Sequence, residues 1–520
     1  MRTRAFSPAL VALLLAGLLL SGCAPSFSFS RQGSGVPAAM PTYAPAAEAR
    51  EAPAYSTGGS ATVNDEPYDA VFFQNYGVNP FVDTEDDHLS TFAMDVDTAS
   101  YTVARRFLRD GNLPDPDSVR VEEFVNYFKQ DYPQPDDGAF AIHLEGAPSP
   151  FGNERHWLMR VGLQGKRIDP ADRKDATLIF VIDISGSMDR ENRLGLVKRS
   201  LRLLVEELRP SDRVGIVVYG SQGEVLLEPT SAENKELILA AIDMLRPGGS
   251  TNAEEGLLLG YRLAARDLQP GRITRLILCS DGVANVGRTG PDSILEQVKG
   301  YVADGITLST VGFGMGNYND VLMEQLANDG DGNYHYVDTL DEARRVFVEN
   351  LTGTLQVIAK DAKVQVDFNP EVVRSYRLLG YENRRVKDED FRNDEVDAGE
   401  VGAGHSVTAL YELKFEGEAQ GIAATVYVRY RDPDSGEVQE ISRSLARADF
   451  VPSIDQTSPR FRLDAAVAEF AEILRDSYWA QDGTMAAVLE LAAPLVAELP
   501  DDPDVAEFVT LVQRAQALGR

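Results

Sequence analysis

The sequence TLIFVIDISGSM, residues 177–188, joins a nearly continuous apolar run to a polar loop that contains glycine. A strand that is covered on both faces requires such a run, so residues 177–184 are expected to form a buried strand of a parallel sheet. At its end, Asp183, Ser185 and Ser187 are spaced i, i+2 and i+4, with Asp183 expected at a solvent-facing strand end. Because ligands of open α/β sheets bind outside the carboxyl ends of the strands, these side chains are candidate ligands.

The surrounding segment, 175–350, alternates apolar strands with amphipathic helices. Further strands are expected at 214–219, 275–280 and 306–313. The helix after the first strand carries one apolar stripe, made of Leu194, Val197, Leu201, Leu204 and Leu208. Strands that alternate with helices of this length indicate a parallel, doubly wound sheet.

Two other loops offer oxygen ligands at the same predicted edge. Thr251 lies in the loop GGSTN, residues 248–252, and Asp281 directly follows the strand predicted at 275–280. An oxygen-only set suits a hard divalent cation, Mg²⁺ in the first place, with Mn²⁺ or Ca²⁺ as alternatives. Two carboxylates can at most balance the charge of such an ion. An open coordination position would therefore attract an anionic oxygen, such as a Glu or Asp carboxylate of a partner protein.

In these three loops the sequence resembles the von Willebrand factor A (VWA) domain, over residues 173–350. The metal-ion-dependent adhesion site (MIDAS) of that family combines Asp-x-Ser-x-Ser with a Thr from a second loop and an Asp from a third. The resemblance implies that Ser185, Ser187 and Thr251 ligate a metal ion. It also implies that Asp183 and Asp281 contact the ion directly or through water.

The segments on both sides of this domain have the period-two alternation of antiparallel strands. Two strands are expected at 140–146 and 157–163, and several more within 363–444. Because an isolated two-stranded ribbon is marginal in water, all of them are predicted to form one β-sandwich into which the VWA domain is inserted. The predicted fold class is therefore multidomain α/β plus β-sandwich, with helical N- and C-terminal regions.

The flanks are similar to a narrower family, the bacterial YfbK-like lipoproteins. The similarity rests on YGVNPF at 76–81, on FAMDVDTASY at 92–101 and on the order of the regions. The family implies a location in the cell envelope. The predicted boundaries are 1–22 for a signal peptide, 23–66 for a flexible tether, 67–172 for an N-terminal α+β region, 173–350 for the VWA domain, 351–447 for the β-sandwich and 448–520 for a C-terminal helical region.

The N-terminus has the pattern of a lipoprotein export signal. Arg2 and Arg4 precede an apolar run too short to span a bilayer, and LSGC at 20–23 resembles a bacterial lipobox. Cleavage before Cys23 and its acylation, with chains such as palmitate, would hold the protein at a membrane surface. Ala24, where some lipoproteins have Asp, is similar to a Gram-negative outer-membrane address, so the protein is expected there, facing the periplasm or the cell surface. The alternative is an ordinary signal peptide with an incidental cysteine.

The composition limits the possible functions. With 50 Lys and Arg against 81 Asp and Glu, the net charge is −31, and no basic cluster offsets it, which argues against duplex nucleic acid as a partner. The two cysteines, Cys23 and Cys279, exclude a disulfide network and a cysteine-rich zinc site.

Three functions remain for the metal loops: a partner-binding module, a structural envelope scaffold with a silent metal site, and a metal-assisted hydrolase. The hydrolase lacks a general base near the loops, so the protein is predicted not to be an enzyme. Two other acidic motifs are assigned to structure. Asp95 and Asp97 are predicted to make turn and helix-capping contacts. The segment NDGDGN at 328–333 is predicted to be a tight connection, because the glycine and glutamate that complete a calcium loop are missing.

Overall fold

The computed structural model describes residues 62–63, 66–67, 73–152, 156–189, 193–282, 291–315 and 318–520. The predicted signal peptide, Cys23 and most of the predicted tether lie outside the described residues. A short pair of strands, β1 (Thr62–Val63) and β2 (Glu66–Pro67), precedes the main part of the chain. Within the described ranges, no helix is both long enough and apolar enough to cross a membrane.

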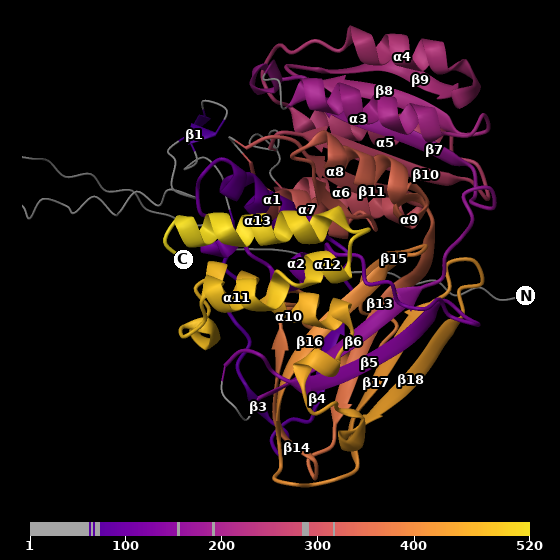
Figure 1. Ribbon diagram of the computed structural model, residues 1–520. Helices are drawn as coiled ribbons and strands as arrows, with labels where there is room; N and C mark the ends of the chain where they lie inside the picture. The colour runs from indigo at the N-terminus through magenta and orange to yellow at the C-terminus, as the bar shows by residue number, and fades with distance from the viewer. Residues whose placement is uncertain are drawn as a thin grey trace, which may run out of the picture. The chain divides into compact units, whose positions relative to one another are not determined.

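The VWA sheet has six strands in the order β12-β11-β10-β7-β8-β9 (Figure 1). Neighbouring strands are parallel, except that β9 runs antiparallel to β8 at one edge. All eight residues of β7 are buried, as the apolar run predicted. The bounds are β7 Ala176–Asp183, β8 Arg213–Tyr219, β9 Gly223–Ser231, β10 Ile273–Ser280, β11 Ile306–Gly312 and β12 Tyr334–Tyr336.

Helices cover both faces of this sheet, which confirms the doubly wound arrangement. Phe180 and Ile182 of β7 share a core with α3, α4 and α8, whereas Ile179 and Val181 share another with α5, α6 and α7. The bounds are α3 Leu194–Glu207, α4 Lys235–Met244, α5 Ala253–Arg266, α6 Pro291–Ala303, α7 Asp320–Asn328, α8 Leu340–Arg344 and α9 Leu351–Leu355, with a π-helical turn at Arg345–Glu349.

Two five-stranded antiparallel sheets form the β-sandwich. One has the order β15-β13-β17-β18, with β4 also paired to β13, and the other has the order β3-β14-β16-β6-β5. Met159 and Val161 of β6, before the VWA domain, share one core with Val364 and Val366 of β13, after it. The prediction of one sandwich with an inserted VWA domain is thus confirmed. The bounds are β3 Val82–Asp83, β4 Leu89–Ala93, β5 Phe140–Pro148, β6 Trp157–Gly165, β13 Val357–Phe368, β14 Val373–Leu379, β15 Gly399–Gly402, β16 Ser406–Phe415, β17 Ile422–Arg431 and β18 Val438–Ala446.

The C-terminal helices build a further core with the N-terminal helices. In Figure 1, α10 and α13 (yellow) lie beside α2 and α1 respectively. The ring of Phe124 contacts Phe470, and that of Phe128 contacts Phe508. Within residues 67–172, the helices therefore pack in this core and the strands belong to the sandwich. The bounds are α1 Ala99–Arg109, α2 Val121–Asn126, α10 Pro459–Leu474, α11 Met485–Ala492, α12 Leu495–Glu498 and α13 Pro503–Ala517.

A partly buried arginine links the VWA domain to the segments around it. Arg384 donates from Nε to Asp95 Oδ2 (2.8 Å) and from Nη2 to Asp97 Oδ2 and to Glu324 Oε1 of α7 (both 3.2 Å). Asp95 Oδ1 accepts the N–H of Asp97 at 2.9 Å, the turn contact that the sequence predicted. The predicted helix cap is wrong, because the N-cap residue of α1 makes no side-chain cap and Asp97 Oδ1 accepts the N–H of Tyr334 instead. The ion pairs with Arg384 were not predicted, because their partners are distant in the sequence.

Candidate metal centre

The strand register of the VWA sheet brings two carboxylates to one edge. Ile182 of β7 is paired with Cys279 of β10, so Asp183 and Ser280 end neighbouring strands together. The Ser280 hydroxyl donates to Asp183 Oδ2 at 3.1 Å. Asp281 follows at once, and its charge acts on Asp183. Two of the predicted site residues are thus neighbours in space.

The two serines of the first loop complete this group. Ser185 Oγ lies 3.0 Å from Ser187 Oγ, and the N–H of Ser185 donates to Asp183 Oδ1 at 2.8 Å. The Ser187 hydroxyl also hydrogen-bonds to Asp281. Two oxygens at adjacent corners of an octahedral Mg²⁺ site, each about 2.1 Å from the ion, lie about 3.0 Å apart. The serine hydroxyls therefore have the spacing of adjacent Mg²⁺ ligands.

The loop that carries Thr251 is hydrogen-bonded to the first loop. The N–H of Gly248 donates to Ile184 O at 2.6 Å, and the N–H of Gly186 donates to Gly249 O at 3.1 Å. Gly249 has a φ of +93°, and a Cβ at this position would lie 2.8 Å from a side-chain oxygen, so the turn requires glycine. Thr251 is half-buried just before α5. The second loop is thereby held against the first, as the predicted ligand set needs.

The carboxylates are more deeply buried than the sequence indicated. Asp183 has an exposed fraction of 0%, so its expected position at a solvent-facing strand end is wrong; Ser185 and Ser280 both donate to its buried carboxylate. Burial, and after it the charge of Asp281, raises the pKa of Asp183 to about 6. Burial also raises the pKa of Asp281. Because the two anions disfavour each other away from water, a cation between them would relieve an unfavourable interaction.

Arg193 belongs to the same centre and was missed by the sequence reasoning. Its side chain is fully buried, and Nη1 donates to Asp281 Oδ2 at 2.5 Å. Nothing in the sequence marks it, because an arginine just before a helix is most often a solvated residue. Only the spatial position beside the third loop identifies it.

Taken together, the donor set fits a hard divalent cation. Carboxylates and hydroxyls of Asp183, Ser185, Ser187 and Asp281 contact one another, and the Thr251 loop is bonded to theirs. Oxygen ligands of this type are those that Mg²⁺ and Mn²⁺ prefer. A bound ion would supply a Lewis-acidic position for an anionic oxygen.

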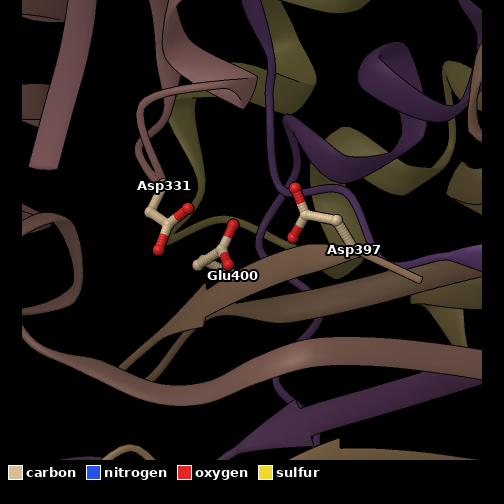
Figure 2. A group of neighbouring side chains, drawn as sticks. All are labelled: Asp331, Asp397 and Glu400. Atoms are coloured by element: carbon tan, nitrogen blue, oxygen red, sulfur yellow. The ribbon is translucent and has the colours of Figure 1, made fainter. Parts of the chain in front are cut away.

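A second group of carboxylates lies near the start of β12, the strand at one edge of the sheet. Asp331, Asp397 and Glu400 place oxygens within 4.8 Å of one another, and Figure 2 shows the side chains gathered around one space. Lys360 Nζ donates to Asp331 Oδ2 at 2.8 Å, so this group already has a cationic partner within the protein. Asp331 lies in the predicted tight connection, but the two carboxylates from the segment around β15 could not be foreseen.

Family models match three parts of the chain. The von Willebrand factor type A domain matches residues 177–352, a model described as von Willebrand factor matches 67–160, and the model described as uncharacterized protein YfbK, C-terminal, matches 353–425 and 414–518. The uncharacterized protein YfbK of Escherichia coli (strain K12) is 38% identical over 473 residues, which cover 86% of this chain and 81% of that protein. The chain belongs to the YfbK family. It carries a VWA domain within that family's framework, as the sequence predicted.

More distant relatives share smaller parts with this YfbK-family chain. Uncharacterized protein sll0103 of Synechocystis sp. is 26% identical over 311 residues, covering 57% of this chain and 72% of that protein. Human inter-alpha-trypsin inhibitor heavy chain H3 is 26% identical over 272 residues, covering 48% of this chain and 30% of that protein. The solved von Willebrand factor type A structure from Catenulispora acidiphila has 14% identity and a TM-score of 0.43, covering 71% of this chain and 89% of that chain.

Proposed function

We propose that this YfbK-family protein is a lipid-anchored protein of the cell envelope whose VWA domain binds a partner protein through a divalent cation, with Mg²⁺ as the first choice. Ser185, Ser187 and Thr251 would ligate the ion, and Asp183 and Asp281 would contact it directly or through water. The observation that carries the proposal is the convergence of the hydrogen-bonded Ser185 and Ser187 hydroxyls on two buried carboxylates.

The chemistry of the ligand set identifies the group that a partner would offer. Hydroxyl ligands add no charge, so the ion would keep an affinity for an anionic oxygen at an open coordination position. A Glu or Asp carboxylate is the protein group that fits. The chain carries a net charge of −31, so the bound ion would provide the local positive field that draws such a group to an acidic protein.

A non-enzymatic role is part of the proposal. Among the described residues, the side chains that contact the two aspartates supply hydroxyls and a guanidinium, and a guanidinium cannot act as a general base. A metal-assisted hydrolase would need a base within reach of a metal-bound water. The first alternative is a scaffold that does not use its metal site, and the hydrolase is the less favoured one.

A pull-down from native membranes tests the binding role. The full chain is expected to retain an envelope protein in Mg²⁺ and to release it when a chelator is added. The Asp183→Ala variant is expected to retain nothing above background in either buffer. Retention that is equal with chelator and in the variant would favour the scaffold, and substrate turnover that depends on Mg²⁺ would favour the hydrolase.

The membrane anchor is proposed from the lipobox at 20–23. Cleavage before Cys23 would leave that cysteine as the N-terminus, and two or three acyl chains on it would suffice for stable attachment. Ala24 supports delivery to the outer membrane, facing the periplasm or the cell surface.

Mass spectrometry of the mature N-terminal peptide checks this anchor. The peptide is expected to begin at Cys23 and to carry the mass of its acyl chains, and Cys23→Ser is expected to release the protein from the membrane fraction. Cys279, which is buried in β10, serves as the matched control, because its replacement by serine leaves the N-terminus unchanged. An unmodified chain that begins elsewhere would rule out the anchor.

A further inference from the structure

Three separate segments of the VWA domain hold the guanidinium of Arg193. Nη1 donates to Asp281 Oδ2 (2.5 Å) in the third loop and to Ser187 O (2.7 Å) in the first, and Nη2 donates to Met315 O (2.5 Å) after β11. Gly314 makes room for the side chain: it has a φ of +81°, and a Cβ there would lie 2.6 Å from Arg193 Cγ. The position of this cation is therefore fixed by the fold.

The charged group that Arg193 contacts belongs to the candidate metal centre. Of its three acceptors, two are neutral backbone carbonyls, and within the described part of the chain Asp281 is the carboxylate with which it forms an ion pair. Asp183 and Asp281 contribute two negative charges, and Arg193 contributes one positive charge. A divalent cation would bring the total to +1, whereas the same centre without Arg193 would be neutral when loaded.

We infer that Arg193 is a positioning and charge-setting residue of the metal centre. It orients Asp281, and it makes the cation bind less tightly while making the loaded centre hold a carboxylate more tightly. This inference rests on the proposed function, since it concerns the same cation and the same anionic partner group. Its physical basis is that a fixed positive charge repels the incoming cation and attracts the incoming anion through a poorly solvated medium.

A purely structural role for Arg193 makes a different prediction. If the residue only held the loops together, its loss would loosen the ligands, and cation binding would become weaker. In a charge-setting role, loss of Arg193 instead raises the affinity for the cation and lowers the affinity for the carboxylate. The sign of the change in cation affinity therefore separates the two roles.

The test compares the full chain with Arg193→Met, Arg193→Gln and Arg193→Lys. Calorimetric titration measures Mg²⁺ affinity, and acetate, as the carboxylate probe, is titrated into the Mn²⁺-loaded protein while water-proton relaxation is followed. In the two neutral variants we expect Mg²⁺ to bind roughly ten-fold more tightly and acetate roughly five-fold more weakly. Arg193→Lys, which keeps the charge, is expected to stay within about two-fold of the original chain for both ligands.

Each outcome decides between the possible roles. Thermal unfolding verifies that the variants are folded, and Arg193→Gln, whose amide can keep one of the hydrogen bonds, provides the comparison if Arg193→Met does not fold. Weaker Mg²⁺ binding in the neutral variants, or no change in either ligand, would overturn the inference and leave the proposed function standing. An original chain that binds no Mg²⁺ would instead overturn the proposed function, and the inference with it.

Discussion

Replacement of Asp183 by alanine is expected to weaken Mg²⁺ binding by at least about 100-fold while the VWA sheet stays folded. Loss of residues that only support a metal ligand typically costs 10- to 100-fold in affinity, and Asp183 is proposed to contact the ion directly or through water. The fold should tolerate the change. The mutation removes the hydrogen bonds that the buried carboxylate accepts from Ser185 and Ser280, but it also removes the repulsion between Asp183 and Asp281. Calorimetric titration gives the affinity, and thermal unfolding gives the stability.

Two companion variants make the experiment specific. Asp189→Ala removes an exposed carboxylate from the same loop and is expected to bind Mg²⁺ like the original chain. Asp331→Ala is expected to do the same, because the second carboxylate group already has Lys360 as its partner. If Asp183→Ala still bound Mg²⁺ and Asp331→Ala did not, the ion would bind at the second carboxylate group, and the proposed centre would be contradicted.

The main features of the fold follow from local sequence patterns. Thr177 is the single polar residue before Asp183 in the apolar run that forms β7, and a strand of that kind can only lie inside a covered sheet. The sandwich was predictable for a different reason: β5 and β6 could not be stable alone, so they needed the strands that follow the VWA domain. Helix partners were not predictable in this way. The apolar stripes of α10 and α13 required a surface, but nothing local shows that α1 and α2 supply it.

The candidate metal centre was predictable only as far as the spacing of its residues in the sequence could be recognised. Asp-x-Ser-x-Ser sets the geometry of one short loop, and the strand order places Asp281 beside it. The burial of Asp183 depends on how the neighbouring strand end at Ser280 and Asp281 packs against it, which the spacing does not express. Arg193 was missed for the same reason, because its contacts to Asp281 and Met315 join segments that are far apart in the sequence.

Replacement of Arg384 by methionine is expected to lower the free energy of unfolding by about 3–5 kcal/mol, the usual cost of removing one partner from a buried ion pair. Methionine keeps much of the side-chain volume but leaves Asp95, Asp97 and Glu324 without their shared cation. These carboxylates are 6%, 3% and 4% exposed, so they are poorly solvated without the guanidinium. Because Glu324 belongs to α7, the same change weakens the hold of the surrounding segments on the VWA domain.

Urea denaturation at two pH values measures this effect and its cause. Arg384 lowers the pKa of Asp97, which burial raises well above its usual range, so losing the arginine should raise that pKa further. A carboxyl group whose pKa is raised by folding stabilises the protein below its unfolded pKa and loses that contribution as the pH rises. The loss in free energy of unfolding caused by Arg384→Met should therefore be larger at pH 8 than at pH 5. Arg392→Met breaks the exposed pair with Glu440 and should cost less than about 1 kcal/mol at either pH. Equal, small losses in both variants would show that the three carboxylates do not depend on Arg384.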